Sequence, residues 1–290
     1  MTGQTGARPP QRQYTEELVS TSTEDGITLD GAVIWPHGAR QPTALVWVHG
    51  FLDHFYSRHI LRVSRALAER GIAVITGNTR GHDIGALAGW TATGPFYAGG
   101  WWELLDQSPR DVGAWMDVVM SLGFGAAVLL GHSLGTGKVL YYQAQRQDAR
   151  VRGLILASPG GGASHPDLER VALAEQMVAE GRGYDLLPWE RWQGALTTTS
   201  AQTHLSHVRF GALFESSRPD APIAQIRCPL LAFLGTEEGG PGRVSELEAL
   251  RHQAVAAPRV ETHMVPHAGH IYAGHEQAVA TLIAGWMESL

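Results

Sequence analysis

Short apolar runs alternate along this chain with stretches that repeat apolar residues at helical spacing. In the intervening stretches apolar residues recur at i, i+3 and i+7, as in Ile60, Val63 and Leu67, and similar patterns span 112–119 and 279–287. Alternation of this kind predicts crossover units and a mostly parallel sheet with helices on both faces. The apolar runs that we expect to form strands are 27–35, 44–48, 72–76, 126–130, 154–157, 230–234 and 260–265.

The composition favours one α/β domain with an insertion and excludes several classes of partner. With 290 residues, 44% of them hydrophobic, the chain can bury a large core. The net charge of −6 comes without the basic patch of a nucleic-acid-binding protein. No apolar run approaches the roughly 18 residues that a membrane span needs. We therefore expect a small-molecule partner, with no nucleic acid and no membrane, and the sequence carries no signal for an oligomeric state.

The first residues and the single cysteine indicate the compartment. Residues 1–13 are polar, contain Pro9-Pro10 and have no apolar signal-peptide core, so we expect a flexible tail. Cys228 cannot form an internal disulfide, which fits a reducing environment. The sequence thus predicts a cytoplasmic protein.

Two long stretches interrupt the alternation. Residues 81–107 are rich in glycine and aromatic residues and are too long for an ordinary connection. Residues 160–227 are longer still, and within them Leu168, Val171, Ala174 and Val178 fall on one expected helical face that ends at Gly181. We expect 160–227 to be a helical cap inserted into an α/β core made of 14–159 and 228–290.

The pentapeptide Gly131-His132-Ser133-Leu134-Gly135 lies between an expected strand and an expected helix. A G-x-S-x-G turn needs glycine on both sides because its backbone is strained, and it exposes the serine Oγ above the sheet edge. Ser133 is therefore the candidate nucleophile. The alternative is a turn serine that only caps a helix.

A serine nucleophile needs a base and a group that orients the base, and both candidates follow later strands. Glu237 and Glu238 come after the run that ends at Leu234, and His267 and His270 come after the run 260–265. The order serine, acid, histidine is that of the α/β-hydrolase triad. From about residue 15 to 290 the chain resembles an α/β-hydrolase.

The resemblance implies roles for individual residues. It assigns His270 as base, with His267 as its rival, and Glu238 as acid, with Glu237 as the alternative. It also implies that the backbone N–H groups of Phe51, after His49-Gly50, and of Leu134 form an oxyanion hole. No metal or organic cofactor is implied.

A narrower resemblance covers residues 45–159. The motifs Asn78-Thr79-Arg80-Gly81-His82-Asp83 and Trp102-Glu103-Leu104-Leu105-Asp106, together with the Ser133 turn and the helix that carries Lys138, are similar to a little-characterised α/β-hydrolase group that includes fungal siderophore esterases. For Lys138, the only lysine, a helix-packing or ion-pair role is expected rather than catalysis.

These observations predict a serine hydrolase that cleaves a carboxylic ester, lactone or thioester of a small, mostly apolar molecule through an acyl-enzyme on Ser133. Two alternatives stay open: acyl transfer or C–C bond cleavage by the same triad, and a non-catalytic ligand-binding protein. Ligand crevices of open α/β sheets lie at the carboxyl ends of the strands, where the two long stretches are expected to meet. The expected substrate-binding residues are Trp101, Trp102, Trp189, Trp192 and Tyr56.

Overall fold

The computed structural model describes residues 13–91, 94–159, 166–192, 195–213, 220–238 and 243–290. Its centre is an eight-stranded sheet in the order β1-β2-β4-β3-β7-β8-β11-β12. β1 and β2 are antiparallel, β2 is antiparallel to β4, and all the other neighbours are parallel. The strands are β1 (Tyr14–Ser22), β2 (Thr28–Pro36), β3 (Thr43–Val48), β4 (Val74–Gly77), β7 (Ala126–His132), β8 (Val151–Ala157), β11 (Leu230–Gly235) and β12 (Val260–Val265).

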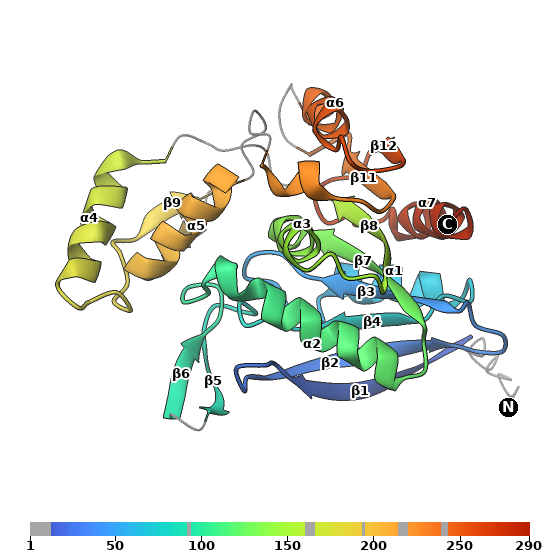
Figure 1. Cartoon of the computed structure of the whole chain (residues 1–290), viewed down its shortest axis with the longest axis horizontal. Helices are drawn as coiled ribbons and strands as arrows, with labels where there is room; N and C mark the ends of the chain where they lie inside the picture. Colours follow the sequence, from blue (N-terminus) through green and yellow to red (C-terminus); the bar gives the residue numbers. More distant parts are fainter. Residues whose placement is uncertain (1–12, 92–93, 160–165, 193–194, 214–219, 239–242) are drawn as a thin grey trace, which may run out of the picture.

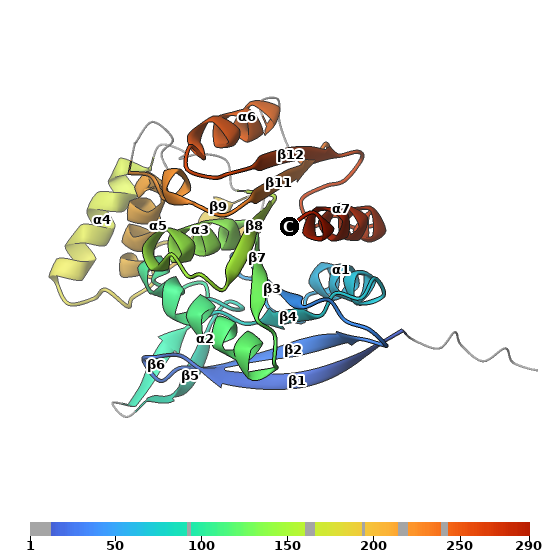
Figure 2. The ribbon, with the colours of Figure 1, turned by 45° about the vertical axis from the view of Figure 1, so that its right-hand side comes forward.

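Helices cover both faces of this sheet (Figures 1 and 2). α1 (Arg58–Ala68) and α7 (Glu276–Glu288) pack on one face. α2 (Ser108–Ser121), α3 (Leu134–Arg146) and α6 (Arg243–Gln253) pack on the other. Two short 3₁₀ turns, 105–107 and 222–225, complete the second layer. The alternating pattern predicted this mostly parallel sheet with helices on both faces, and the architecture is that of an α/β-hydrolase, as the resemblance implied.

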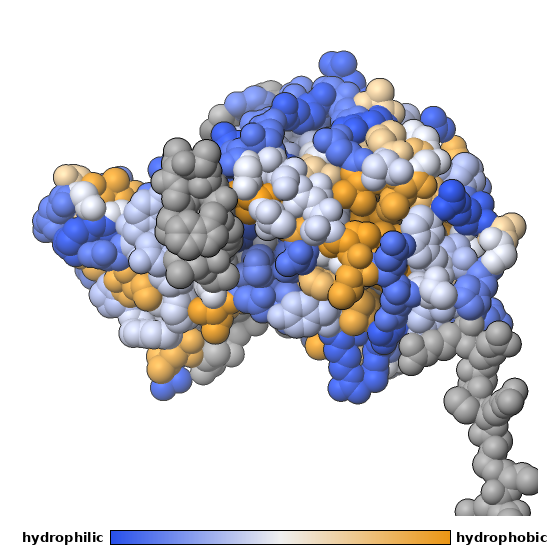
Figure 3. All heavy atoms as spheres, turned by 90° about the horizontal axis from the view of Figure 1, so that it is seen from below, coloured by the Kyte–Doolittle hydropathy of each residue, from blue (hydrophilic) through white to orange (hydrophobic). Residues whose placement is uncertain are grey.

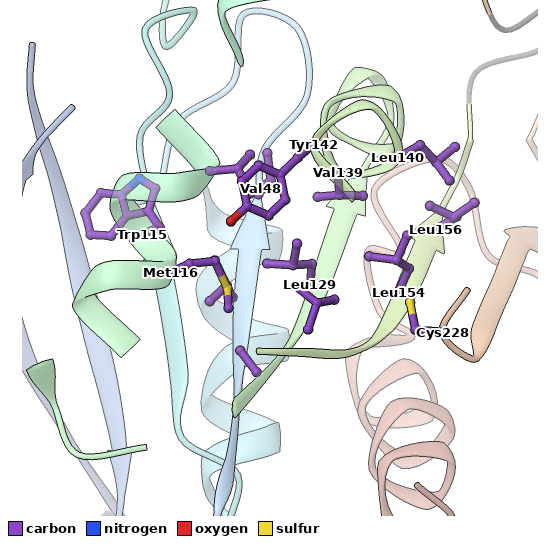
Figure 4. Close-up of a cluster of buried hydrophobic side chains, with 14 of the residues drawn as sticks. Val48, Trp115, Met116, Leu129, Val139, Leu140, Tyr142, Leu154, Leu156 and Cys228 are labelled. Atoms are coloured by element: carbon purple, nitrogen blue, oxygen red, sulfur yellow. The ribbon is translucent and has the colours of Figure 1, made fainter. Parts of the chain in front are cut away.

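The main hydrophobic core lies between the sheet and the α2–α3 layer. Figure 4 shows Val48 and Leu129 of the sheet against Trp115, Met116 and Val139 of the helices, all buried. Each fully buried side chain of this size stabilises the fold by about 1.5–3 kcal/mol relative to exposure. This layer therefore fixes the height of α2 and α3 above the sheet.

All seven apolar runs form strands, with no bound more than three residues from the expected one. β1 was not expected, because most of its side chains are exposed and the strand has no apolar run. α2 begins at Ser108, because the 3₁₀ turn 105–107 leads directly into the helix and Ser108 Oγ donates a hydrogen bond to Leu105 O.

A smaller lobe lies beside the sheet and is built from the middle of the chain. α4 (Leu168–Ala179) packs on α5 (Ala201–Leu213). The segment that connects the two helices contains the short strands β9 (Glu190–Trp192) and β10 (Ala195–Thr197), which form an antiparallel pair. Figure 1 shows this lobe at the left, away from the sheet. A second hairpin, of β5 (Ala86–Thr91) and β6 (Gly94–Ala98), precedes α2.

The helices expected in this lobe are present, and the buried face of α4 agrees in part with the expected one. Ala174 is buried and Val171 is partly buried, whereas Leu168 is 75% exposed and Val178 is 40% exposed. Met177, outside the expected face, is buried with Ala174 and Leu187. The buried face is therefore narrower than expected and extends to Met177, because its partner is the small surface of α5 and not the broad sheet. Gly181 follows α4 with φ +76°, as expected for a residue that ends a helix.

One tryptophan joins α2 to the antiparallel edge of the sheet. Trp115 is 1% exposed, and its indole Nε1 donates a hydrogen bond to Asn78 O at 2.8 Å. Its ring lies directly on the backbone of Gly77, where an added Cβ would come 2.0 Å from a ring atom. The absence of a side chain at Gly77 therefore allows the indole to reach β4.

Gly77→Ala should destabilise the protein by about 1–3 kcal/mol, because the added methyl group displaces the Trp115 ring from its packed position on β4. Gly285→Ala is the matched control, since Gly285 lies in α7, is exposed and has no atom within 4 Å of an added Cβ. The control should be stabilised by about 0.5–1 kcal/mol through helix propensity. Urea unfolding of both variants measures the two effects, and equal stability of Gly77→Ala and wild type would contradict the packing described.

Candidate active site

Ser133 occupies the sharp turn between β7 and α3. β7 ends at His132 and α3 begins at Leu134. The backbone of Ser133 has φ 54° and ψ −124°, which is unfavourable for a residue with a side chain. A strained serine at a strand-to-helix turn has the geometry that lifts a nucleophilic Oγ clear of a sheet.

Close backbone contacts explain the two glycines of the motif. A Cβ on Gly131 would lie 2.3 Å from the carbonyl oxygen of Gly135, and a Cβ on Gly135 would lie 2.3 Å from the carbonyl oxygen of Val48. Only glycine fits at either position. The backbones of β3, β7 and α3 are therefore in direct contact at this point, and the contact fixes the position of Ser133.

His270 and Glu238 form a hydrogen-bonded pair at the same edge of the sheet. Glu238 follows β11 and His270 follows the neighbouring parallel strand β12. His270 Nδ1 lies 3.0 Å from Glu238 Oε2. The His270 side chain is 49% exposed and that of Glu238 only 3%, so the imidazole is accessible while its carboxylate partner is not.

The His270 loop is tied directly to the serine turn. His132, the residue before Ser133, is buried, and its Nε2 lies 2.8 Å from the carbonyl oxygen of His270. The two imidazole centroids are 5.0 Å apart. A single hydrogen bond therefore joins the turn that carries Ser133 to the loop that carries the imidazole.

Three donors converge on the carboxylate of Glu238. Besides His270, the N–H of Gly235 donates to Oε1 at 2.7 Å, and the Ser158 hydroxyl donates to the same oxygen. Burial alone would raise the pKa of Glu238, but these hydrogen bonds outweigh it, and the pKa lies below its usual value. Glu238 is therefore a carboxylate at neutral pH and able to orient an imidazole.

Ser158 was missed by the sequence reasoning. It directly follows β8, has φ +49°, and its hydroxyl also lies 2.5 Å from Tyr272 OH. Its only sequence signal is a polar residue at the end of an apolar strand, which many ordinary turns share. Its contact with Glu238 depends on the neighbouring positions of β8 and β11 in the sheet, which the sequence alone does not give.

The rival residues lie elsewhere. Glu237 and His267 are both exposed, and His267 Nδ1 is 3.7 Å from Glu237 Oε1 at the surface. The structure thus pairs Glu237 with His267 and Glu238 with His270. His275 is the N-cap residue of α7 and lies before its first turn.

The segment His49-Gly50-Phe51 lies against the serine turn. A Cβ on Gly50 would come 2.9 Å from Ser133 Cβ and 3.4 Å from its Oγ, so the Gly50–Phe51 peptide is adjacent to the hydroxyl. Leu134 is the first residue of α3, where backbone N–H groups have no partner within the helix. Both expected oxyanion donors, Phe51 and Leu134, are therefore close neighbours of Ser133.

A buried imidazole orients the Gly50–Phe51 peptide. His49 Nε2 accepts a hydrogen bond from Thr79 N–H at 2.9 Å, so the hydrogen of the neutral ring is on Nδ1, which donates to Gly50 O at 2.9 Å. In a trans peptide the carbonyl and the next N–H point in opposite directions. Holding the Gly50 carbonyl therefore also fixes the direction of the Phe51 N–H.

The sequence match agrees with this architecture. The model of the alpha/beta hydrolase family matches residues 45–283, which include the Ser133 turn and the loops of Glu238 and His270. The chain belongs to the α/β-hydrolase family.

Solved structures share this fold with the α/β-hydrolase at low sequence identity. A carboxyl esterase from Bacillus coagulans has a TM-score of 0.69 at 16% identity, covering 94% of this chain and 98% of that one. The α/β-hydrolase GrgF from Penicillium has a TM-score of 0.68 at 16% identity, with 94% and 96% covered. Est1E from Butyrivibrio proteoclasticus, bound to ferulic acid, has a TM-score of 0.64 at 20% identity, with 93% and 98% covered. A comparison with curated protein sequences gives no match.

Lys138 of this α/β-hydrolase is a buried ion-pair partner, as its sequence position suggested. It is fully buried in α3, forms an ion pair with Glu103 and donates to Thr79 Oγ1 at 2.9 Å. Thr79 in turn donates its N–H to His49. The motifs that contain Thr79 and Glu103 thus hold the His49 imidazole through a chain of hydrogen bonds and one ion pair.

The expected substrate-binding aromatics of the α/β-hydrolase lie in two places. Tyr56 is half-exposed, stacks on His54 and donates to Asp83 Oδ1 at 3.2 Å. Trp102 donates its Nε1–H to Tyr184 O at 3.0 Å, which joins the 81–107 stretch to the smaller lobe. Trp192 ends β9, and its side chain lies outside the described part of the chain.

Trp101 and Trp189 are in contact near the oxyanion segment. Their rings meet edge to face at 5.2 Å between centroids, and Trp189 is 57% exposed. The preceding Gly100 lies against Phe51, since a Cβ on Gly100 would come 3.2 Å from the Phe51 ring.

A separate cleft of about 590 Å³ is lined by residues such as Thr23, Arg110 and Arg150 and does not include Ser133.

Two further properties complete the description of the α/β-hydrolase. Within the described ranges, Asp53, His59 and His132 offer three donor atoms within 4.8 Å of one another and are the candidate metal-binding group. None of the helices in those ranges combines the length and apolar character needed to cross a bilayer.

Two histidines outside the His270–Glu238 pair, the buried His49 and the partly buried His207, should make the stability depend on pH. Burial, reinforced by the positive charge of Lys138, lowers the pKa of His49 to about 3 and that of His207 to about 4. In the unfolded chain each takes up a proton near pH 6.5. The unfolded state therefore binds more protons below that pH, and the stabilisation present above about pH 6.5 is lost as the pH falls.

Between pH 6 and pH 5 each of these imidazoles should lower the free energy of unfolding by roughly 1 kcal/mol. His207→Asn should remove one such contribution to the slope, whereas His252→Asn, on the exposed surface of α6, should leave the slope unchanged. Urea unfolding at several pH values measures both. Identical slopes for wild type and His207→Asn would show that His207 is not held neutral.

Proposed function

We propose that this α/β-hydrolase is a serine hydrolase that cleaves a carboxylic ester, lactone or thioester of a small, mostly apolar molecule. The observation that carries the proposal is the His270–Glu238 pair at 3.0 Å, joined by His132 to the strained turn of Ser133. A buried carboxylate, an accessible imidazole and a serine at a strand-to-helix turn are the three groups that acyl transfer through serine requires.

The hydrogen bonds assign the proton positions. Glu238 accepts the hydrogen of His270 Nδ1, which leaves the lone pair on Nε2. In the proposed reaction Ser133 Oγ attacks the ester carbonyl, and Nε2 takes the serine proton and returns it to the leaving alcohol. A water molecule then attacks the acyl-enzyme while His270 Nε2 takes its proton. Nε2 returns that proton to Ser133 Oγ as the acyl–oxygen bond breaks, which releases the acid and regenerates Ser133.

The negative charge that develops on the carbonyl oxygen would be stabilised by the N–H groups of Phe51 and Leu134. The first is oriented by His49 and the second lies at the N-terminus of α3. Removing one donor of this kind typically costs about 3–4 kcal/mol of transition-state stabilisation. Because both donors are backbone groups held by buried contacts, they need no rearrangement during the reaction.

The smaller lobe supports an apolar substrate. Figure 3 shows it projecting at the left with hydrophobic side chains on its surface. Exposed apolar residues of this lobe are Leu168, Val178, Tyr184, Leu186, Trp189 and Leu196. We propose that 160–227 is a substrate cap over a core of 14–159 and 228–290. Est1E, which has the same fold, binds ferulic acid, so aromatic acyl groups are included in the proposed substrate class.

Glu238→Gln should lower kcat for an activated ester about 10³- to 10⁴-fold, because the amide stabilises neither the required tautomer nor the imidazolium. Glu237→Gln is the matched control, since Glu237 is exposed beside His267, and it should retain wild-type kcat. Steady-state hydrolysis of a nitrophenyl ester measures both, with Ser133→Ala giving the background. Loss of activity in Glu237→Gln with retention in Glu238→Gln would overturn the assignment of the acid.

Trp189→Ala should lower kcat/KM for esters of bulky aromatic acids at least tenfold relative to acetate esters. The side chain is largely exposed and touches Trp101 beside the oxyanion segment, so its loss removes an apolar surface without opening the core. Leu168→Ala, at the start of α4, removes an exposed apolar side chain and should leave the ratio unchanged. An unchanged substrate ranking in Trp189→Ala would place the acyl pocket elsewhere.

A further inference from the structure

Three side chains from separate segments meet behind the serine turn. Asp53 lies in the loop after β3, His59 in the first turn of α1, and His132 at the end of β7. One donor atom of each lies within 4.8 Å of the other two. The proposed hydrolysis uses none of these atoms, so the cluster requires a separate explanation.

The His132 ring presents a lone pair to this cluster. Its Nε2 faces the carbonyl oxygen of His270, which can only accept, so the hydrogen of the neutral ring is on Nε2. Nδ1 then has a free lone pair, and it is buried with no hydrogen-bond partner among the described residues. Histidines that bind metals almost always donate their other ring N–H in this way, often to a backbone carbonyl.

Asp53 is oriented by hydrogen bonds to its other oxygen, and His59 directs a ring nitrogen at the same point. Asp53 Oδ1 accepts hydrogen bonds from His54 N–H, at 2.9 Å, and from the Ser57 hydroxyl, which fixes the carboxylate. Its Oδ2 remains directed at the cluster, 3.4 Å from His59 Nε2. That nitrogen is also buried without a hydrogen-bond partner in the described part of the chain.

We propose that Asp53, His59 and His132 bind a divalent transition metal, with Zn²⁺ as the best match. Two imidazole nitrogens and one carboxylate oxygen suit zinc, whereas calcium and magnesium prefer oxygen ligands alone. The Asp53 and His59 side chains are 18% and 11% exposed, so an ion and a water ligand can reach the site from the surface. Small rotations of the two rings would bring the donors to bonding distance.

The proposed ion would have a structural role. Bound to His132 Nδ1, it would strengthen the Nε2–H···O=C bond to His270 and so hold the histidine loop against the serine turn. It would also tie α1 and the loop after β3 to β7. The competing explanation is an ion pair between Asp53 and a protonated His59, in which a proton occupies the place of the metal.

Zinc titration of chelator-treated Ser133→Ala protein tests the proposal without reference to activity. We expect one Zn²⁺ per chain with Kd at or below 1 µM in a competition with a chromogenic chelator, and a rise in Tm on binding. Asp53→Asn and His59→Gln should each weaken binding at least 100-fold. His82→Gln is the matched control, because His82 pairs with Asp83 in a partly exposed contact outside the cluster.

Wild-type affinity in both His59→Gln and Asp53→Asn, or binding weaker than 100 µM in the parent, would overturn the site. An absence of any zinc-dependent rise in Tm would favour the Asp53–His59 ion pair and would equally overturn the proposed metal site. Should either ligand variant lose its circular dichroism signal, His59→Asn and Asp53→Ser serve as replacements in the same titration. None of these outcomes bears on ester hydrolysis, so this proposal can fail while the proposed function stands.

Discussion

The structure depends on a backbone crossing that only glycine permits. Gly131 and Gly135 bring the end of β7, the start of α3 and the end of β3 within contact, because a Cβ at either glycine would lie 2.3 Å from a carbonyl oxygen. That crossing forces Ser133 into its strained conformation and places the Gly50–Phe51 peptide beside its hydroxyl. The positions of the candidate nucleophile and of its proposed oxyanion donors thus follow from one steric constraint.

Buried polar groups then hold the loops around this crossing. His49 orients the Gly50–Phe51 peptide. Burial, and then the charge of Lys138, lowers the pKa of His49 and keeps its imidazole neutral, while Lys138 also donates to Thr79. On the other side His132 holds the backbone of the loop that carries His270. Each of these hydrogen bonds satisfies a buried polar atom that would otherwise destabilise the fold, whereas His132 Nδ1 has no partner among the described residues. The proposed zinc ion would extend this network to α1.

The sequence predicted the parts of this arrangement that local patterns encode. Apolar runs gave the central strands, and the glycine-flanked serine gave the turn, because both depend on neighbouring residues. It did not predict β1, whose side chains are mostly exposed, and it predicted the buried face of α4 only in part, because that face is set by contact with α5. Ser158 was missed, since its contact with Glu238 arises from strand order. The resemblance named Glu238 with Glu237 as the alternative, and the fold pairs Glu238 with His270.

The central claim is that Ser133 is the group that becomes acylated. Reaction with a tagged fluorophosphonate followed by peptide mass spectrometry tests it most directly, because the reagent modifies a serine only where a base activates the hydroxyl. The account predicts a single adduct on Ser133, absent from Ser133→Ala protein under the same conditions. An adduct on another residue, or no adduct on folded wild-type protein, would contradict it.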